Sequence, residues 1–226
     1  MLSSIVLCAL AAALPTRAQD VALNGIRLGM TLEEARAKLP PDLHITRPDT
    51  GFPPQVTTLF AERIPFTGDD IDDEAYTIEA VNDRVAYIKR IVTHSPKNAP
   101  DRAAFQQSLI ATYGAPSPYT PAAVQGAYPM WLWDRNGKLE PNGDSCPGGL
   151  ALAPGAKGLY RPVMITSPSA NPDLPGCRVV LFVVFDRRTN RIPWAKLDWV
   201  EYSLSDDSMF FKGLNRAATD KSPLPQ

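Results

Sequence analysis

Two strand-like runs separated by only two residues constrain the fold of this chain more than any other feature. Tyr76–Val81 and Arg84–Val92 are rich in β-branched and aromatic residues, and only Asn82 and Asp83 lie between them. Asn and Asp tolerate the positive φ angles that a two-residue hairpin turn requires. The pattern therefore predicts an antiparallel β-hairpin.

Other runs of strand-like composition lie on both sides of this hairpin. The segment Val179–Phe185 is apolar at every position, which is typical of a strand that is covered on both faces. The full set of further predicted strands is Val56–Phe66, Met130–Asp134, Leu150–Ala153, Leu159–Thr166, Arg178–Arg187 and Lys196–Leu204.

Helix signals occur near the start of the chain and again near its middle. Thr31 and Glu34 have the spacing of a capping box, and Pro40 stops the helix that it begins. A second helix is predicted over Asp101–Tyr113, where Gly114 follows as a C-terminal cap. A short helix is also expected around Ser208–Ala217.

The order of these elements is helix and then strands, twice over. This order predicts the α+β class, with helices packed on antiparallel sheet in two helix-then-strand units. After a leader at 1–18, the units would span 19–97 and 98–226. Whether they share one continuous sheet or form two domains stays open at this point.

The first 18 residues have the features of a secretory signal peptide. An apolar run is followed by Thr16-Arg17-Ala18, which fits the small-residue rule of signal peptidase. The run is too short to span a membrane, so we expect no membrane insertion of the mature chain and a periplasmic or secreted location. The formal net charge of −1 and the lack of a basic stripe argue against a nucleic-acid partner.

Cys146 and Cys177 are the two cysteines that remain after removal of the leader, which holds Cys8. In an exported chain two thiols are most simply one disulfide, here within the second unit. A catalytic thiol or a metal site are the rival interpretations. The enclosed loop 147–176 is rich in Gly and Pro. It is either a binding surface that the disulfide preorganises for a partner, or a long loop that the disulfide only ties to the domain.

The opening pattern resembles that of small exported bacterial proteins. Ile26-Arg-Leu-Gly-Met-Thr31, with Glu34 and Ala35, and the later Leu109, Tyr113, Gly114 and Pro116, are similar to motifs of the β-lactamase-inhibitory-protein type and of the related small lipoprotein of the outer-membrane assembly machine. The resemblance implies a helical opening on an antiparallel sheet, and a protein that works by contact. Only Gly29, Met30 and Thr31 carry over, as structural positions.

The most concentrated charge lies in Gly68–Glu74, with carboxylates at Asp69, Asp70, Asp72, Asp73 and Glu74. Carboxylate oxygens are the ligands that Ca²⁺ prefers, so Asp70, Asp72 and Glu74 are candidate calcium ligands, although the spacing is not that of an EF-hand. A solvated acidic loop and a recognition surface for a basic partner are the alternatives.

Aromatic residues of the second half supply another candidate binding surface. Trp131 and Trp133 share one face of their predicted strand, and Tyr160 is also a candidate. They predict either an aromatic platform for a sugar or a peptide, or cross-strand core packing.

Support for catalysis is thin. His44 and His94 are the only histidines, they lie on different segments, and no known catalytic motif surrounds them. The sequence therefore predicts an envelope binding or scaffold protein that acts through contacts with a protein partner, without a cofactor, and an inhibitor is one form of such a protein. The alternative is a carboxylate-based hydrolase of the periplasm.

Overall fold

The computed structural model describes residues 17–46, 49–51, 56–63, 72–117, 129–134, 136–139, 149–154, 160–165, 177–186, 193–206 and 208–209. Within these residues the secondary structure is mostly β. The helices are η1 Ala18–Asp20, α1 Leu32–Arg36 and α2 Arg102–Tyr113. The strands are β1 Ala22–Leu23, β2 Ile26–Arg27, β3 His44–Ile45, β4 Asp49–Gly51, β5 Val56–Glu62, β6 Asp73–Val81, β7 Arg84–Thr93, β8 Met130–Asp134, β9 Gly149–Pro154, β10 Tyr160–Ile165, β11 Cys177–Asp186 and β12 Trp199–Asp206.

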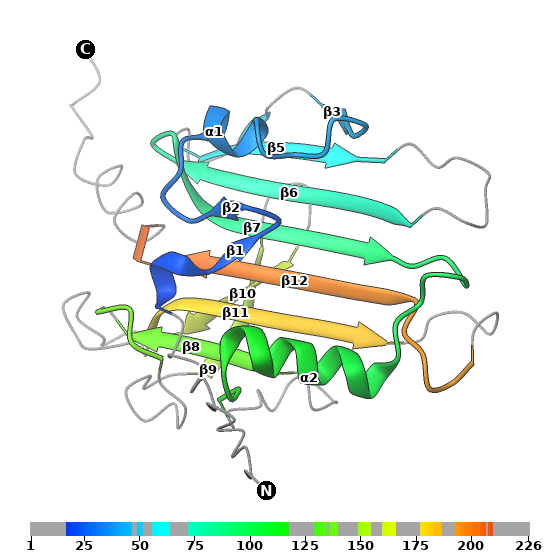
Figure 1. Ribbon diagram of the computed structural model, residues 1–226. Helices are drawn as coiled ribbons and strands as arrows, with labels where there is room; N and C mark the ends of the chain where they lie inside the picture. Colours follow the sequence, from blue (N-terminus) through cyan, green and yellow to red (C-terminus); the bar gives the residue numbers. More distant parts are fainter. Residues whose placement is uncertain are drawn as a thin grey trace, which may run out of the picture.

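One antiparallel sheet takes strands from both halves of the chain (Figure 1). Its order is β3-β5-β6-β7-β12-β11-β8, and β4 also pairs with β5. The halves join where β7 pairs with β12, from Trp199 opposite Thr93 to Ser205 opposite Tyr87. The strands of 19–97 and of 98–226 therefore form one continuous sheet.

The predicted fold class was wrong. The chain does not form two helix-then-strand units: among the described residues only α2 is a helix of more than five residues, and the strands dominate. The first helix, α1, has only five residues, since it ends at Arg36 and does not continue to Leu39 and the two prolines as predicted. The first half therefore consists mainly of strands, and the β7–β12 pairing joins the two halves edge to edge in one sheet.

The predicted hairpin is confirmed as β6 and β7. Asn82 and Asp83 have φ angles of +51° and +60°, as a two-residue turn of this kind requires. The register then shifts by one residue at a β-bulge between Glu79 and Ala80, so that Asp73 lies opposite Thr93. This shift sets which residues face one another at the far end of the hairpin.

The opening segment attaches to this hairpin as a structural element. The predicted capping box is present, because the Thr31 hydroxyl accepts from the Glu34 amide and the Glu34 carboxylate accepts from the Thr31 amide. The Gly29 amide, at a φ of +82°, donates to the Val85 carbonyl at 2.7 Å, and the Val85 amide donates back to Met30 at 2.8 Å. These bonds account for the opening motif as scaffold.

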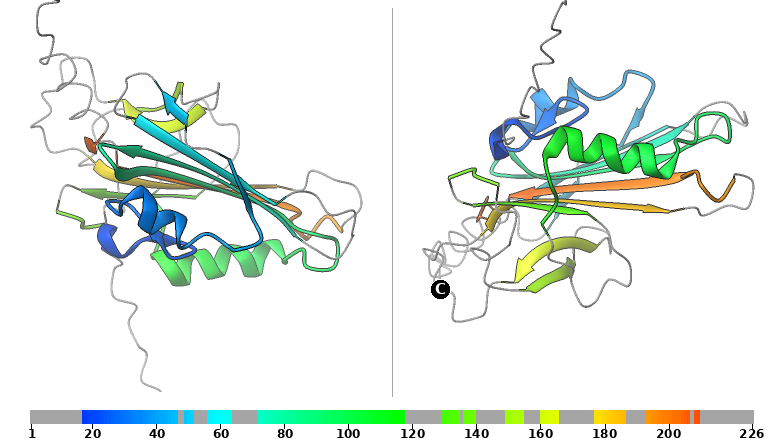
Figure 2. Two further views of the ribbon diagram at one scale, coloured as in Figure 1. Left: turned by 90° about the horizontal axis from the view of Figure 1, so that it is seen from above. Right: turned by 60° about the horizontal axis from the view of Figure 1, so that its bottom comes forward.

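Both helices and the β1–β2 hairpin lie on the same face of the sheet, which we call the helix face (Figure 2). Residues of this face form the main core, including Ile26, Ala35, Ile78, Leu109 and Leu181. In Figure 1, α1 and the β1–β2 hairpin lie over one end of β6 and β7, and α2 lies over β11 and β8. Within the described residues, no helix lies in front of the other ends of β6 and β7.

The opposite face carries the β9–β10 hairpin, whose strand β10 contacts β11 and β12 (Figure 2). Residues of β11 that point to either face are buried, such as Val180 and Leu181, which confirms that this strand is covered on both sides. No helix within the described residues has the length and apolar character needed to cross a membrane.

Candidate functional site

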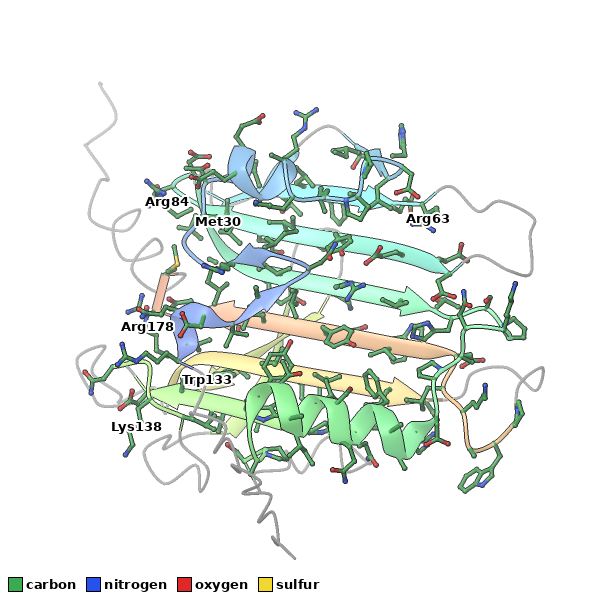
Figure 3. The ribbon with its side chains drawn as sticks, viewed as in Figure 1. Met30, Arg63, Arg84, Trp133, Lys138 and Arg178 are labelled. Atoms are coloured by element: carbon green, nitrogen blue, oxygen red, sulfur yellow. The ribbon has the colours of Figure 1, made fainter. Side chains whose placement is uncertain are left out.

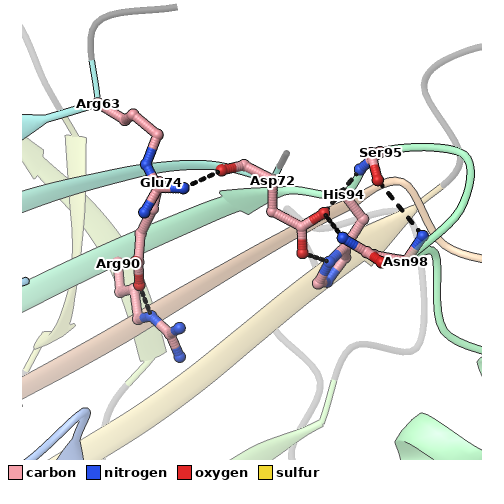
Figure 4. Close-up of polar contacts among 7 residues, drawn as sticks. All are labelled: Arg63, Asp72, Glu74, Arg90, His94, Ser95 and Asn98. Atoms are coloured by element: carbon pink, nitrogen blue, oxygen red, sulfur yellow. Dashed lines mark hydrogen bonds and ion pairs between the residues drawn. The ribbon is translucent and has the colours of Figure 1, made fainter. Parts of the chain in front are cut away.

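The described part of the acidic segment lies at the open end of the β6–β7 hairpin, on the helix face (Figure 4). Asp72 and Glu74 point to this face, whereas Asp73 is exposed at the start of β6. Asp69 and Asp70 lie outside the described residues. The part of the segment that is described is thus fixed by contacts and is not a solvated loop.

Asp72 is held by three hydrogen bonds from the loop that follows β7. Its Oδ1 accepts from the Ser95 amide at 2.9 Å and from Asn98 Nδ2 at 3.2 Å, and its Oδ2 lies 2.8 Å from His94 Nδ1. Arg63 Nη1 donates to the Asp72 carbonyl at 3.0 Å. The loop itself is anchored to the sheet, because the His94 amide donates to the Asp198 carbonyl at 2.7 Å.

These contacts change the acidity of Asp72. Burial alone would raise the pKa of its carboxyl group, but the hydrogen bonds from the Ser95 amide, His94 and Asn98 together outweigh burial. The pKa of Asp72 therefore lies below its ordinary value, and the carboxylate stays ionised at neutral pH.

A second set of polar contacts centres on Glu74, which lies two residues after Asp72 and points to the same face. Glu74 Oε1 accepts from Tyr76 Oη at 2.7 Å and from Arg90 Nε at 2.6 Å. The exposed fraction of the side chain is 12% for Glu74 and 27% for Arg90. The ion pair thus lies at the edge of the covered region, where the Arg90 side chain still reaches solvent.

The charge of Arg90 acts on two further tyrosines, Tyr202 and Tyr113. Its guanidinium carbon lies 5.7 Å from the centre of the Tyr202 ring, the residue directly opposite it on β12. Burial raises the pKa of Tyr202 to about 12 and also raises that of Tyr113, while the charge of Arg90 acts against both shifts. Both phenols therefore stay protonated at neutral pH and lie within range of the same cation.

We call Asp72, Glu74, Arg90, His94 and Tyr202 the polar strip. These residues occupy the helix face of β6, β7 and β12 where the apolar core ends. Figure 3 shows Arg63 at this end of the sheet and Lys138 and Arg178 at the other. The strip is therefore separated along the strands from the charged residues near β8.

The His94 imidazole has the orientation of an acid–base group. Asp72 holds Nδ1, and Nε2 has no hydrogen-bond partner among the described residues. The side chain is 18% exposed, so part of the imidazole reaches solvent. No Ser, Thr or Cys side chain of the described residues is hydrogen-bonded to this imidazole, and the pair therefore lacks an assembled nucleophile.

Among the described residues, no group of three or more His, Cys, Asp or Glu side chains is placed to hold a metal ion. Of the candidate calcium ligands, Asp70 lies outside the described residues. Asp72 already accepts three hydrogen bonds and Glu74 accepts from a cation, so both carboxylates are engaged by the protein itself.

Trp131 and Trp133 are fully buried in the core. Trp131 Nε1 donates to the Gly114 carbonyl at 2.9 Å, and its ring centre lies 5.4 Å from that of Tyr113. The core-packing interpretation therefore describes these two residues, because a buried ring presents no platform to a ligand. Tyr160 begins β10, and its side chain is outside the described part.

The disulfide prediction stays a prediction. Cys146 lies outside the described residues, and Cys177 is described only as the first residue of β11, opposite Asp134. Most of the loop 147–176 also lies outside, apart from β9 and β10. Residues 1–16 of the expected leader are not described either.

Sequence reasoning missed Arg90 and the pairing of Asp72 with His94. A plain hairpin that closes on Asn82 and Asp83 would place Asp72 opposite Thr93, and His94 would then point to the other face of the sheet from Asp72. The bulge moves the register by one residue and brings Asp72 and His94 together. The sequence did contain a signal for Arg90. Glu74 and Tyr76 are polar and two residues apart, so they share one face of a strand, and Arg90 is a polar residue of the strand across the turn.

Comparison with protein-family models, with curated protein sequences and with solved structures found no match for this chain.

Proposed function

We propose that this chain is an exported envelope protein that binds or scaffolds a partner protein, and that the polar strip is its contact surface. The observation that carries the proposal is the strip itself. It places partly exposed charged groups on a face that is otherwise apolar, and hydrogen bonds fix several of them before any partner arrives.

Such preorganisation favours binding, because the groups lose little conformational freedom when a partner contacts them. Arginine and tyrosine are also the residue types that dominate binding energy at protein interfaces. An inhibitor is one form that a protein of this kind takes, and the resemblance of the opening motif to inhibitory proteins agrees with it.

A capture experiment with matched variants tests the proposal. The purified wild-type protein, the strip variant Arg90→Lys/His94→Gln and the control variant Arg36→Lys/His44→Gln are immobilised and exposed to an envelope extract of the producing cell. Arg36 and His44 are exposed and lie outside the strip, so the control carries the same substitutions elsewhere.

We expect the wild type and the control to retain one protein in stoichiometric amount, and the strip variant to lose it. Near-ultraviolet circular dichroism establishes that all three proteins are folded. Equal retention by the strip variant contradicts the assignment of the contact surface, and an extract from which none of the three retains a protein contradicts the binding function.

The Asp72–His94 pair favours a second candidate, a hydrolase of the periplasm. A carboxylate that holds Nδ1 orients the imidazole so that Nε2 can take a proton from water, as in general base catalysis. This candidate differs from the predicted carboxylate-based hydrolase in that the base is His94 and Asp72 positions it.

A panel of ester, amide and glycoside substrates tests the hydrolase. We expect hydrolysis that His94→Gln abolishes and that Asp72→Asn reduces, with His44→Gln as the control. An activity of the same rate in His94→Gln rules out this assignment.

A further inference from the structure

The Arg90 side chain leaves part of its guanidinium without a partner. Its contacts among the described residues are the hydrogen bond from Nε to Glu74 and the stacking on Tyr202. Nη1 and Nη2 have no hydrogen-bond partner there, and in Figure 4 they point away from Glu74. An arginine whose outer edge is unoccupied is a donor pair of fixed geometry.

Glu74 does not saturate the site. It contacts only Nε, through Oε1, and the same oxygen accepts from Tyr76 Oη. The ion pair fixes the direction of the guanidinium, with Nη1 and Nη2 on the side away from Glu74 (Figure 4). A second carboxylate can therefore approach Nη1 and Nη2 without displacing Glu74.

One phenol supplies a further donor beside this guanidinium. Tyr202 lies directly opposite Arg90 on β12, with its ring centre 5.7 Å from the guanidinium carbon, and its hydroxyl group has no hydrogen-bond partner among the described residues. An arginine edge together with a neutral hydroxyl donor matches an acceptor-only ligand.

From this arrangement we propose that Arg90, with Tyr202, binds a carboxylate group of the partner. This inference rests on the proposed binding function. It adds that the partner presents a carboxylate group to Arg90. The carboxylate pairs with Nη1 and Nη2 in the bidentate manner that arginine supports and lysine does not.

Two small probes test the site without knowledge of the partner. N-acetylalanine offers a terminal carboxylate, and N-acetylaspartate N-methylamide offers only a side-chain carboxylate. The corresponding amides are the neutral controls. Each is titrated into the ¹⁵N-labelled full chain while NMR follows the Arg Nε–H signals, and that of Arg90 is assigned from its absence in Arg90→Lys.

We expect a saturable shift of the Arg90 signal with at least one carboxylate probe and none with its amide. The probe that binds more tightly identifies the source as a chain terminus or an acidic side chain. Binding should weaken by about tenfold or more in Arg90→Lys, which keeps a cation for Glu74, and by a smaller factor in Tyr202→Phe.

The inference is overturned when neither carboxylate shifts the signal, when the amides shift it equally, or when Arg90→Lys binds the probes as the wild type does. Because the titration uses no partner, it is independent of the capture experiment. A protein partner that is retained through the strip, together with an unresponsive Arg90, refutes the carboxylate site and leaves the binding function standing.

Discussion

Replacing Asp72 with Ala removes the acceptor of hydrogen bonds at 2.9, 2.8 and 3.2 Å from Ser95, His94 and Asn98. A hydrogen bond to a charged group contributes roughly 1.5–3 kcal/mol when it is shielded from water. The Asp72 side chain is 29% exposed, so water competes for the carboxylate. We therefore expect Asp72→Ala to lower the free energy of unfolding by about 2 kcal/mol at neutral pH.

The pH dependence of this difference has a defined sign. The pKa of Asp72 is lower in the folded chain than in the unfolded chain, because the three hydrogen bonds outweigh burial. Its stabilisation is therefore complete above the ordinary aspartate pKa of about 4 and disappears as the pH falls through the folded value. The difference between wild type and Asp72→Ala should shrink in acid.

Urea denaturation of both proteins, at neutral pH and in acid, measures the two quantities. Asp73→Ala is the matched control, because Asp73 is an exposed neighbour that points to the opposite face, and its effect should stay within about 0.5 kcal/mol. Equal stability of wild type and Asp72→Ala at neutral pH refutes the reasoning, as does a difference that persists unchanged in acid.

Three further changes follow from the same contacts. Asp83→Gly should raise the free energy of unfolding by about 0.5–1 kcal/mol, since Asp83 has a φ of 60°, and a lower thermal midpoint would contradict this. Trp131→Phe should cost about 2 kcal/mol in urea denaturation, because it removes the 2.9 Å bond to the Gly114 carbonyl and buried ring area; an unchanged midpoint would show that the bond contributes nothing. Burial raises the pKa of Tyr202 to about 12, so the unfolded chain releases this proton first and the wild type should lose stability between about pH 10 and pH 12. In Tyr202→Phe that alkaline loss should be smaller, and identical alkaline profiles would argue against it.

Local chemistry allowed the sequence to predict individual elements. Asn82 and Asp83 placed the hairpin turn, since few residues tolerate positive φ angles. Thr31 and Glu34 placed the start of α1 through a capping box, whose partners are three residues apart. Both predictions depend on neighbours in the chain, which the sequence displays directly.

The arrangement of these elements depends on pairings that the sequence does not display. β7 and β12 lie side by side although Thr93 and Trp199 are far apart in the chain. Alternating polarity indicates that each segment is a strand, but it does not say which strand is its neighbour. The sequence therefore left open whether the two halves share one sheet, and the structure shows that they do.

The site was only partly predictable for a similar reason. Asp72 and Glu74 were identified from their charge. Their partners are Arg90, in β7, and His94, directly after β7, and the bulge at Glu79 sets the register that brings them together. Nothing in the composition of a hairpin fixes the position of a bulge.

Site-specific photocrosslinking in the producing cell tests the central claim most directly. A benzophenone amino acid replaces Lys97, an exposed residue of the loop that carries Asn98, and in a second strain it replaces Lys138, an exposed residue near β8. If the polar strip is the contact surface, irradiation yields one discrete protein adduct from position 97 and none from position 138. Adducts of the same protein from both positions, or an adduct from position 138 alone, would contradict the account.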